Sequence, residues 1–220
     1  HGGAKKDEYN TPSLERVTKG FLNLEKHIEN CKHFGITPVV AINHFPSDSA
    51  EEIEFVQQQC STHGVKAKVA KGFELGGQGT TELAQAVCDS IESGANQFKP
   101  LYDWSLSIED KIIKIATSIY GATAVEFSSK AHTQLKTIKT LGYDKLPVCM
   151  AKTEKSLSDN MELKGRPENF TVHVREFEFA AGAGFIIPIL GEIMRMPGLP
   201  TVPASEHMDI DNNGKIIGLS

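Results

Sequence analysis

The chain has 220 residues, of which 40% are hydrophobic, so it can bury a core and form one large or two small domains. Its formal charge of −5, with the lysines spread out, argues against a nucleic-acid-binding surface, which needs a basic face. The cysteines form no C-x-x-C pair, so we expect buried free thiols in a cytoplasmic or organelle-matrix protein, without a disulfide framework or a zinc site.

The first half of the chain predicts helices that alternate with short buried strands. Apolar residues spaced by threes and fours predict helices over 13–34, near 53–56 and near 83–91. Short apolar runs predict parallel strands at 37–42 and 65–70. Asp48, followed three residues later by Glu51, resembles a capping box. This order is typical of βα units in an α/β layered fold.

After a break at 94–100, the second half predicts a mixed α/β unit. Helices are predicted at 107–119 and 129–141, and strands at 124–127, 146–151 and 170–179. The alternation of the last strand slips at Arg175 and Glu176, which indicates a β-bulge. The segment 209–214 imitates the start of a calcium loop, but Ser220 stands where Glu is needed. We expect instead a turn at Asn213–Gly214 that joins two short strands.

The apolar run 182–204 invites a membrane interpretation that its own residues oppose. Glycines and the charged Glu192 and Arg195 interrupt it, and four prolines remove backbone donors. The prolines are Pro188, Pro197, Pro200 and Pro203. We expect a packed, turning backbone that is neither an ordinary helix nor an ordinary strand, and no membrane partner.

Two loops follow the carboxyl ends of the predicted strands, where ligands bind in α/β sheets. The first loop carries Asn43, Phe45 and Pro46, and the second carries Phe73 within a glycine-rich stretch. The glycines of the second loop are Gly76, Gly77 and Gly79. The two phenylalanines could sandwich a flat heterocycle, with the glycines allowing it to approach the backbone. The alternative is that both are unrelated core residues, because most aromatic residues in loops have a structural role.

Other polar groups point to no chemistry. The eight histidines form no H-E-x-x-H motif, no Ser lies in a nucleophile elbow, and we predict neither a metal site nor a catalytic residue. Lys152, Lys155 and Arg166 cluster around a polar loop, for which a solvated surface is the simpler interpretation.

Several segments together resemble formate–tetrahydrofolate ligase, in order and over essentially the whole chain. They are His1-Gly-Gly3, Asn23-Leu-Glu-Lys-His-Ile28, Pro38-Val-Val-Ala-Ile-Asn43, Leu146-Pro-Val-Cys-Met-Ala-Lys-Thr153, Ser156-Leu-Ser-Asp159, Gly165-Arg-Pro167, Gly182-Ala-Gly-Phe185 and 191–204. The resemblance is to the C-terminal portion of that enzyme. It implies that residues 1–97 complete a P-loop NTPase-like nucleotide-binding sheet and that residues 98–220 form a smaller mixed α/β domain.

The resemblance also implies a reaction and its partners. The family joins formate to tetrahydrofolate with ATP, through formyl phosphate, and magnesium accompanies ATP. The chain lacks a G-x-x-x-x-G-K-[ST] motif, so the phosphates and magnesium are expected on an N-terminal portion absent from this sequence. The family's loops imply that Phe45, and Phe73 in place of a usual Trp, stack on the adenine or the pterin ring. A cytoplasmic homo-oligomer is implied. The alternative is an inactive binding or oligomerisation module.

Overall fold

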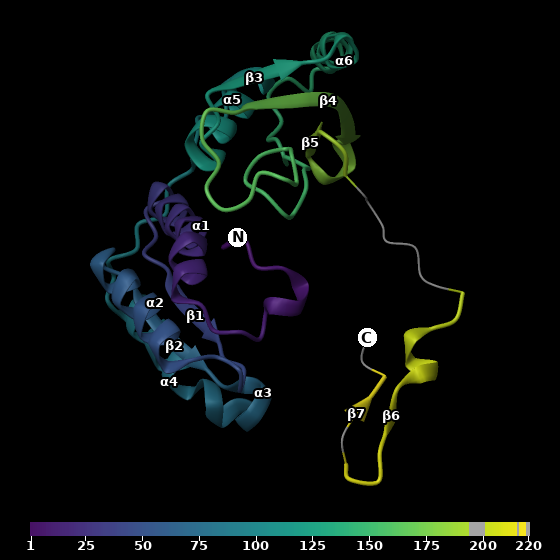
Figure 1. The fold of residues 1–220 in the computed structure, drawn as a ribbon. Coiled ribbons are helices and arrows are strands. Elements are labelled where there is room, and N and C mark those ends of the chain that lie inside the picture. The colour runs from purple at the N-terminus through teal and green to yellow at the C-terminus, as the bar shows by residue number, and fades with distance from the viewer. Residues whose placement is uncertain (194–200, 215, 219–220) are drawn as a thin grey trace.

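The computed structural model describes residues 1–193, 201–214 and 216–218 (Figure 1). Its helices are α1 (Leu14–His33), α2 (Ala50–Thr62), α3 (Gly72–Leu75), α4 (Thr81–Glu92), α5 (Ile108–Ile115) and α6 (Ser129–Thr140). Its strands are β1 (Val39–Asn43), β2 (Lys66–Ala70), β3 (Ala124–Phe127), β4 (Thr171–Ala180), β5 (Phe185–Leu190), β6 (Asp209–Ile210) and β7 (Ile216–Ile217). Short helical turns are η1 (Lys6–Glu8), η2 (Gly76–Thr80), η3 (Ala116–Tyr120), η4 (Ala181–Ala183) and η5 (Ala204–His207).

The first sheet pairs β1 and β2 in parallel, with Asn43 opposite Ala70 at their carboxyl ends. Helices α1 and α2 pack together over it through a cluster of buried residues, which are Phe21, Ile28, Cys60 and Val65. The predicted parallel βα units are therefore confirmed, and so is the α/β class. The narrower prediction of a P-loop NTPase-like sheet stays a prediction.

The capping box of α2 lies one residue later than predicted. Ser49 Oγ accepts a hydrogen bond from the Glu52 N–H, and the Glu52 carboxylate accepts one from the Ser49 N–H, both at 3.3 Å. Asp48 instead accepts from the Phe45 N–H at 2.9 Å, within the preceding turn. The predicted pair of Asp48 and Glu51 was wrong because Asp48 is engaged in stabilising that turn.

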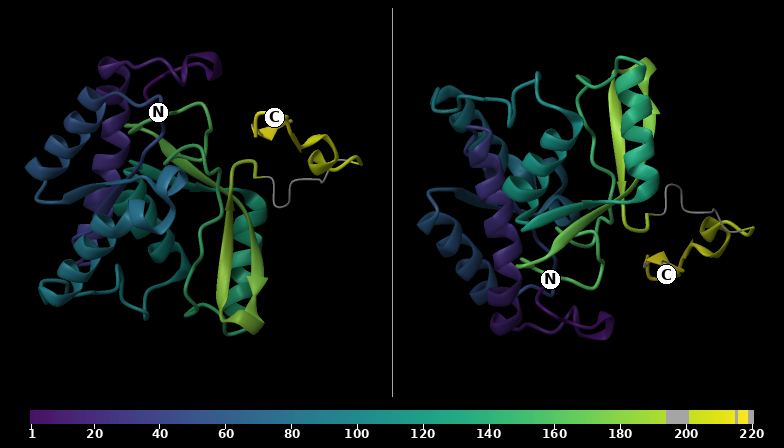
Figure 2. Two further views of the ribbon diagram at one scale, coloured as in Figure 1. Left: turned by 90° about the horizontal axis from the view of Figure 1, so that it is seen from below. Right: turned by 90° about the horizontal axis from the view of Figure 1, so that it is seen from above.

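The second sheet has the order β3-β4-β5, with β3 parallel and β5 antiparallel to β4. Helix α6 lies along β4 (Figure 2). Its core includes the fully buried Ile112, Val172 and Leu190. The predicted bulge is confirmed, because the register shifts between Val174 and Glu176. The two clusters of buried residues come from either side of residue 97, and the domain division there stays a prediction.

Two strand predictions in this half were wrong. Residues 146–151 form only isolated bridges to β5, at Val148 and Ala151, because Pro188 lacks the N–H that would donate to this segment between the two bridges. Conversely, the run that was expected to avoid regular structure contains β5, with Pro188 inside it. The Pro188 carbonyl accepts a hydrogen bond from the Ala151 N–H at 2.9 Å, so the backbone polar groups of Pro188 face away from β4. The missing N–H of Pro188 therefore removes no hydrogen bond between β5 and β4. Residues 194–200 of the run lie outside the described part.

The turn predicted at Asn213–Gly214, which joins two short strands, is confirmed. β6 and β7 pair antiparallel around a turn in which the Gly214 N–H donates to the Asp211 carbonyl at 2.9 Å, as predicted. In the described part of the chain, no helix is long and apolar enough to cross a membrane.

Helix α1 connects the two halves of the molecule through charged side chains. Arg166 donates to Glu25 at 2.9 Å and to Glu29 at 2.8 Å, and Lys26 Nζ donates to the Ser118 carbonyl at 3.0 Å. The prediction that these side chains form a solvated surface is therefore wrong for Arg166, which is hydrogen-bonded to α1. Lys152 is also bonded within the fold, and only Lys155 is exposed.

Burial separates the four cysteines, and only Cys60 is a buried thiol of the expected kind. Cys88 and Cys149 are exposed, and Cys31 is half-buried. Burial raises the pKa of the Cys60 thiol, which makes it less reactive. We expect Cys88 and Cys149 to react with a thiol reagent in the folded protein and Cys60 to react only after unfolding. Mass spectrometry of the labelled peptides measures this order, and early labelling of Cys60 in the folded protein would contradict the burial.

Candidate functional site

The two loops singled out in the sequence lie side by side at one edge of the first sheet. They follow the carboxyl ends of β1 and β2, which are adjacent and parallel. The His44 N–H donates to the Ala70 carbonyl at 3.0 Å, so the first loop begins as an extension of the strand pairing. The Lys71 N–H donates to the Gly79 carbonyl at 2.9 Å and closes the base of the second loop.

The aromatic rings of these loops face each other and are open to solvent. The ring centroids of Phe45 and Phe73 are 6.3 Å apart, with an angle of 41° between the planes. Phe45 is 46% exposed and Phe73 is 79% exposed, so neither is a core residue. A flat ring between two others needs about 7 Å, twice the contact distance of about 3.5 Å. The pair must therefore open slightly and become parallel before it can hold a heterocycle.

A polar contact joins the two aromatic loops beside the rings. His44 Nδ1 and Glu74 Oε1 are 2.9 Å apart, and each residue neighbours one of the phenylalanines. On the first loop, Asp48 binds the Phe45 N–H, and Pro46 restricts the backbone that follows. The pairing of His44 with Glu74 is not evident from the sequence, because the two residues are 30 positions apart.

The three glycine positions of the second loop differ in how strictly the backbone requires glycine. Gly76 has a φ of 57° and a ψ of −139°, a region that other residues rarely adopt. A Cβ on Gly79 would lie 2.4 Å from the Lys71 carbonyl oxygen, whereas a Cβ on Gly77 would meet nothing within 4 Å. Gly79 thus permits the close approach that closes the loop, and Gly77 leaves open space above it.

Replacing Gly79 with alanine is expected to destabilise the loop, while Gly77→Ala serves as a matched control. Because the backbone must shift to relieve the clash with the Lys71 carbonyl, we expect a loss of about 1–3 kcal/mol for Gly79→Ala. Gly77→Ala should change the free energy of unfolding by less than about 0.5 kcal/mol. Chemical denaturation measures both values, and equal effects of the two substitutions would contradict this assignment.

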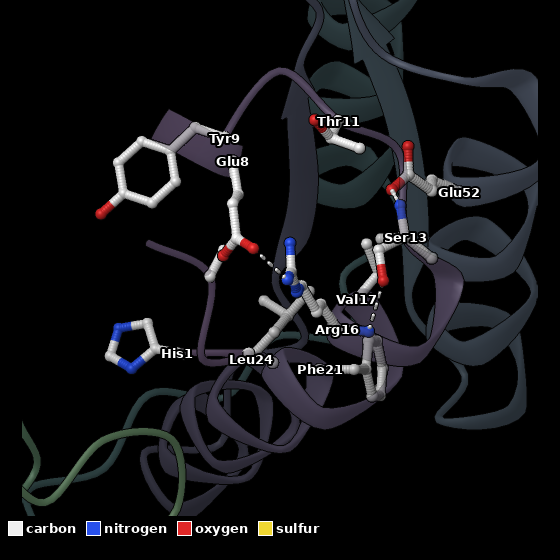
Figure 3. Close-up of a pocket in the computed structure, with 14 residues that line it drawn as sticks. His1, Glu8, Tyr9, Thr11, Ser13, Arg16, Val17, Phe21, Leu24 and Glu52 are labelled. Atoms are coloured by element: carbon white, nitrogen blue, oxygen red, sulfur yellow. Dashed lines mark hydrogen bonds and ion pairs between the residues drawn. The ribbon is translucent and has the colours of Figure 1, made fainter. Parts of the chain in front are cut away.

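A second hollow lies at the N-terminus of α1 (Figure 3), with a volume of about 500 Å³. Arg16 pairs with Glu8 across it at 2.8 Å, and the Ser13 N–H donates to Glu52 at 2.7 Å. The Lys5 N–H, and then Arg16, lower the pKa of Glu8. This cavity is not evident from the sequence, because η1 and the starts of α1 and α2 come together only in the folded chain.

No metal centre is evident at these loops or elsewhere in the described residues, which contain no group of three His, Cys, Asp or Glu side chains able to hold an ion.

The family model described as formate–tetrahydrofolate ligase matches residues 1–220, the full length of the chain. The chain belongs to this family. The resemblance seen in the sequence is thereby confirmed. Membership in the formate–tetrahydrofolate ligase family implies a ligase of one-carbon metabolism that uses ATP, formate and tetrahydrofolate.

Proposed function

We propose that this chain supplies the ring-binding walls of a ligase that joins formate to tetrahydrofolate. The observation that carries the proposal is the exposed pair of Phe45 and Phe73 on adjacent βα loops. Ligands of α/β sheets bind at this edge. The family match supports the reaction, and Phe73 stands where the resemblance led us to expect a larger indole.

In the proposed reaction, ATP transfers its γ-phosphoryl group to a formate oxygen and gives ADP and formyl phosphate. The N10 amine of tetrahydrofolate then attacks the formyl carbon, phosphate leaves, and the amine proton passes to solvent. This chain contributes binding and orientation, which lower the entropic cost of bringing the reactants together. Phe45 and Phe73 stack on the adenine or the pterin ring. Asn43, Pro46 and the glycines Gly76, Gly77 and Gly79 shape the backbone around it.

The proposal assigns the phosphate chemistry to a P-loop-bearing N-terminal portion, since these 220 residues contain no G-x-x-x-x-G-K-[ST] motif. Residues 1–97 would complete its nucleotide-binding sheet, with magnesium held by that portion, and residues 98–220 would form the second domain of a cytoplasmic homo-oligomer. The test is formation of 10-formyltetrahydrofolate by the complete enzyme. Product that requires ATP, formate and tetrahydrofolate together supports the proposal, and product formed without any one of them refutes it.

A second candidate is an inactive binding or oligomerisation module. It is favoured by the β6–β7 hairpin, where Ile210, Ile216 and Ile217 are exposed. Exposed apolar groups of this kind promote association. Sedimentation of the complete protein, alone and with ADP or tetrahydrofolate, distinguishes the module from the ligase. Self-association without binding of either compound favours the module. Binding of either compound favours the ligase.

A further inference from the structure

An aromatic cavity lies between the end of α1, η3 and the segments 98–104 and 148–150. Its volume is about 390 Å³, which is within the range of small-molecule sites. No residue of the loops that follow β1 and β2 lines it, so it is separate from the proposed ligase site. Its described lining is mostly aromatic and aliphatic and contains no Asp, Glu, Lys, Arg or His.

The backbone holds Phe98 beside Phe34 at this cavity. The Lys99 N–H donates to the Phe34 carbonyl at 3.0 Å. The Gln97 N–H donates to the Gly35 carbonyl at 2.9 Å. The two phenyl rings are nearly parallel, with centroids 6.1 Å apart and 5° between the planes. Phe98 is 67% exposed, so much of its ring stays available to a ligand.

Tyr102 and Trp104 form a second aromatic wall of the cavity. Their rings meet edge to face at 6.1 Å, and Trp104 is 57% exposed. The Val148 N–H donates to the Tyr102 hydroxyl at 3.4 Å and anchors that ring. Burial, and then Cys149, raise the pKa of Tyr120 to about 12, so its hydroxyl stays uncharged at neutral pH. The cavity therefore presents uncharged rings, which favours a planar aromatic ligand.

A lysine lies behind each of the tyrosines that line the cavity. Lys111 Nζ is 5.9 Å from the centre of the Tyr102 ring, and Lys152 Nζ is 5.0 Å from the centre of the Tyr120 ring. Neither lysine lines the cavity, and Lys111 is fully buried, so each charge acts from behind its ring. Both ammonium groups donate to backbone carbonyls, and neither forms an ion pair with a described carboxylate.

Ammonium groups in these positions change which ligand the tyrosine rings favour. A cation over one face of a ring attracts the π electrons toward itself. The opposite face becomes less negative, so it repels the π electrons of a second ring less. A positively charged ligand would instead be repelled by Lys111 and Lys152. The cavity therefore favours a ring that is rich in electrons over one that is poor in electrons or cationic.

We infer that the aromatic cavity binds a neutral, electron-rich planar aromatic molecule. The ligand contacts the exposed rings of Phe98 and Trp104 and faces the tyrosines that the two lysines polarise. The inference does not rest on the proposed ligase function, because the two sites share no residue. The competing occupant is a second copy of the chain that covers the exposed rings.

The probe is 4-methoxybenzyl alcohol, which is neutral and electron-rich. The reporter is the indole N–H signal of Trp104 in a proton–nitrogen NMR spectrum, because the chain contains one tryptophan. We expect a saturable shift of this signal at millimolar probe. The neutral, electron-poor 4-nitrobenzyl alcohol should bind roughly threefold more weakly. The cation 4-methoxybenzylamine should bind at least about fivefold more weakly.

Three outcomes of this series would overturn the inference. The first is the absence of saturation with 4-methoxybenzyl alcohol. The second is an affinity for the nitro compound or the amine that equals or exceeds that for the probe. The third is a Trp104 signal that shifts with protein concentration while the probe fails to bind, which would show that a second copy covers the cavity.

Phe98→Ala locates the binding in the cavity. The affinity for 4-methoxybenzyl alcohol should fall roughly fivefold, while the melting temperature stays nearly unchanged because the ring is mostly exposed. Phe179→Ala, which removes a partly exposed ring outside the cavity, should leave the affinity unchanged. Unchanged probe affinity in folded Phe98→Ala contradicts the site. If Phe98→Ala does not fold, the series of three ligands on the unmodified chain decides.

Discussion

Replacing Phe45 with alanine in the complete enzyme is expected to weaken binding of one ring-bearing substrate roughly five- to tenfold. The melting temperature should stay nearly unchanged, because Phe45 is 46% exposed and removing its ring leaves no core cavity. Calorimetric titration of ADP and of tetrahydrofolate, measured separately, shows which ring occupies the site. The affected compound identifies adenine or pterin as the partner of the stacking pair.

Phe179→Ala is the matched control for that experiment. Phe179 is 42% exposed, close to the value for Phe45, but lies on β4 in the other sheet. It should leave both affinities unchanged. A large fall in melting temperature for Phe45→Ala, with both affinities retained, would mean that the Phe45 ring packs in the fold and does not bind substrate.

The purified 220-residue chain alone is expected to form no 10-formyltetrahydrofolate. Phosphoryl transfer depends on positioned amides and cations around the phosphates, and the chain has no motif that would supply them. We expect a loss of at least about a thousandfold relative to the complete enzyme. Product is measured after incubation with ATP, formate and tetrahydrofolate.

Fusion of the same residues to a P-loop-bearing portion in one polypeptide should restore the reaction. This control separates a missing phosphate site from a misfolded chain. Turnover by the isolated 220 residues that depends on all three substrates would refute the proposal that the phosphate chemistry belongs to a separate P-loop-bearing portion.

Local patterns predicted much of the fold, because they depend on neighbouring residues. The spacing of apolar residues located α1, and the slip in alternation located the bulge in β4. Strand β5 was not predicted because it contains Pro188. A strand accepts proline where the missing N–H would not have bonded to the neighbouring strand, and the sequence does not show which way that position faces. Similarly, the apolar segment 146–151 reads as a strand but makes only isolated bridges.

The candidate site was predictable in position but not in geometry. Strand ends and loop residues indicated that Phe45 and Phe73 would lie near each other, and their rings do. Their exposure and tilt depend on tertiary contacts, such as the pairing of His44 with Glu74.

A crystal structure of the complete enzyme with ADP or tetrahydrofolate bound tests the central claim most directly. We predict an adenine or pterin ring between Phe45 and Phe73, with the two phenyl rings nearly parallel and about 7 Å apart. Both compounds bound elsewhere, with the phenyl centroids still 6.3 Å apart and tilted by 41°, would contradict the assignment of these rings as the walls of the site.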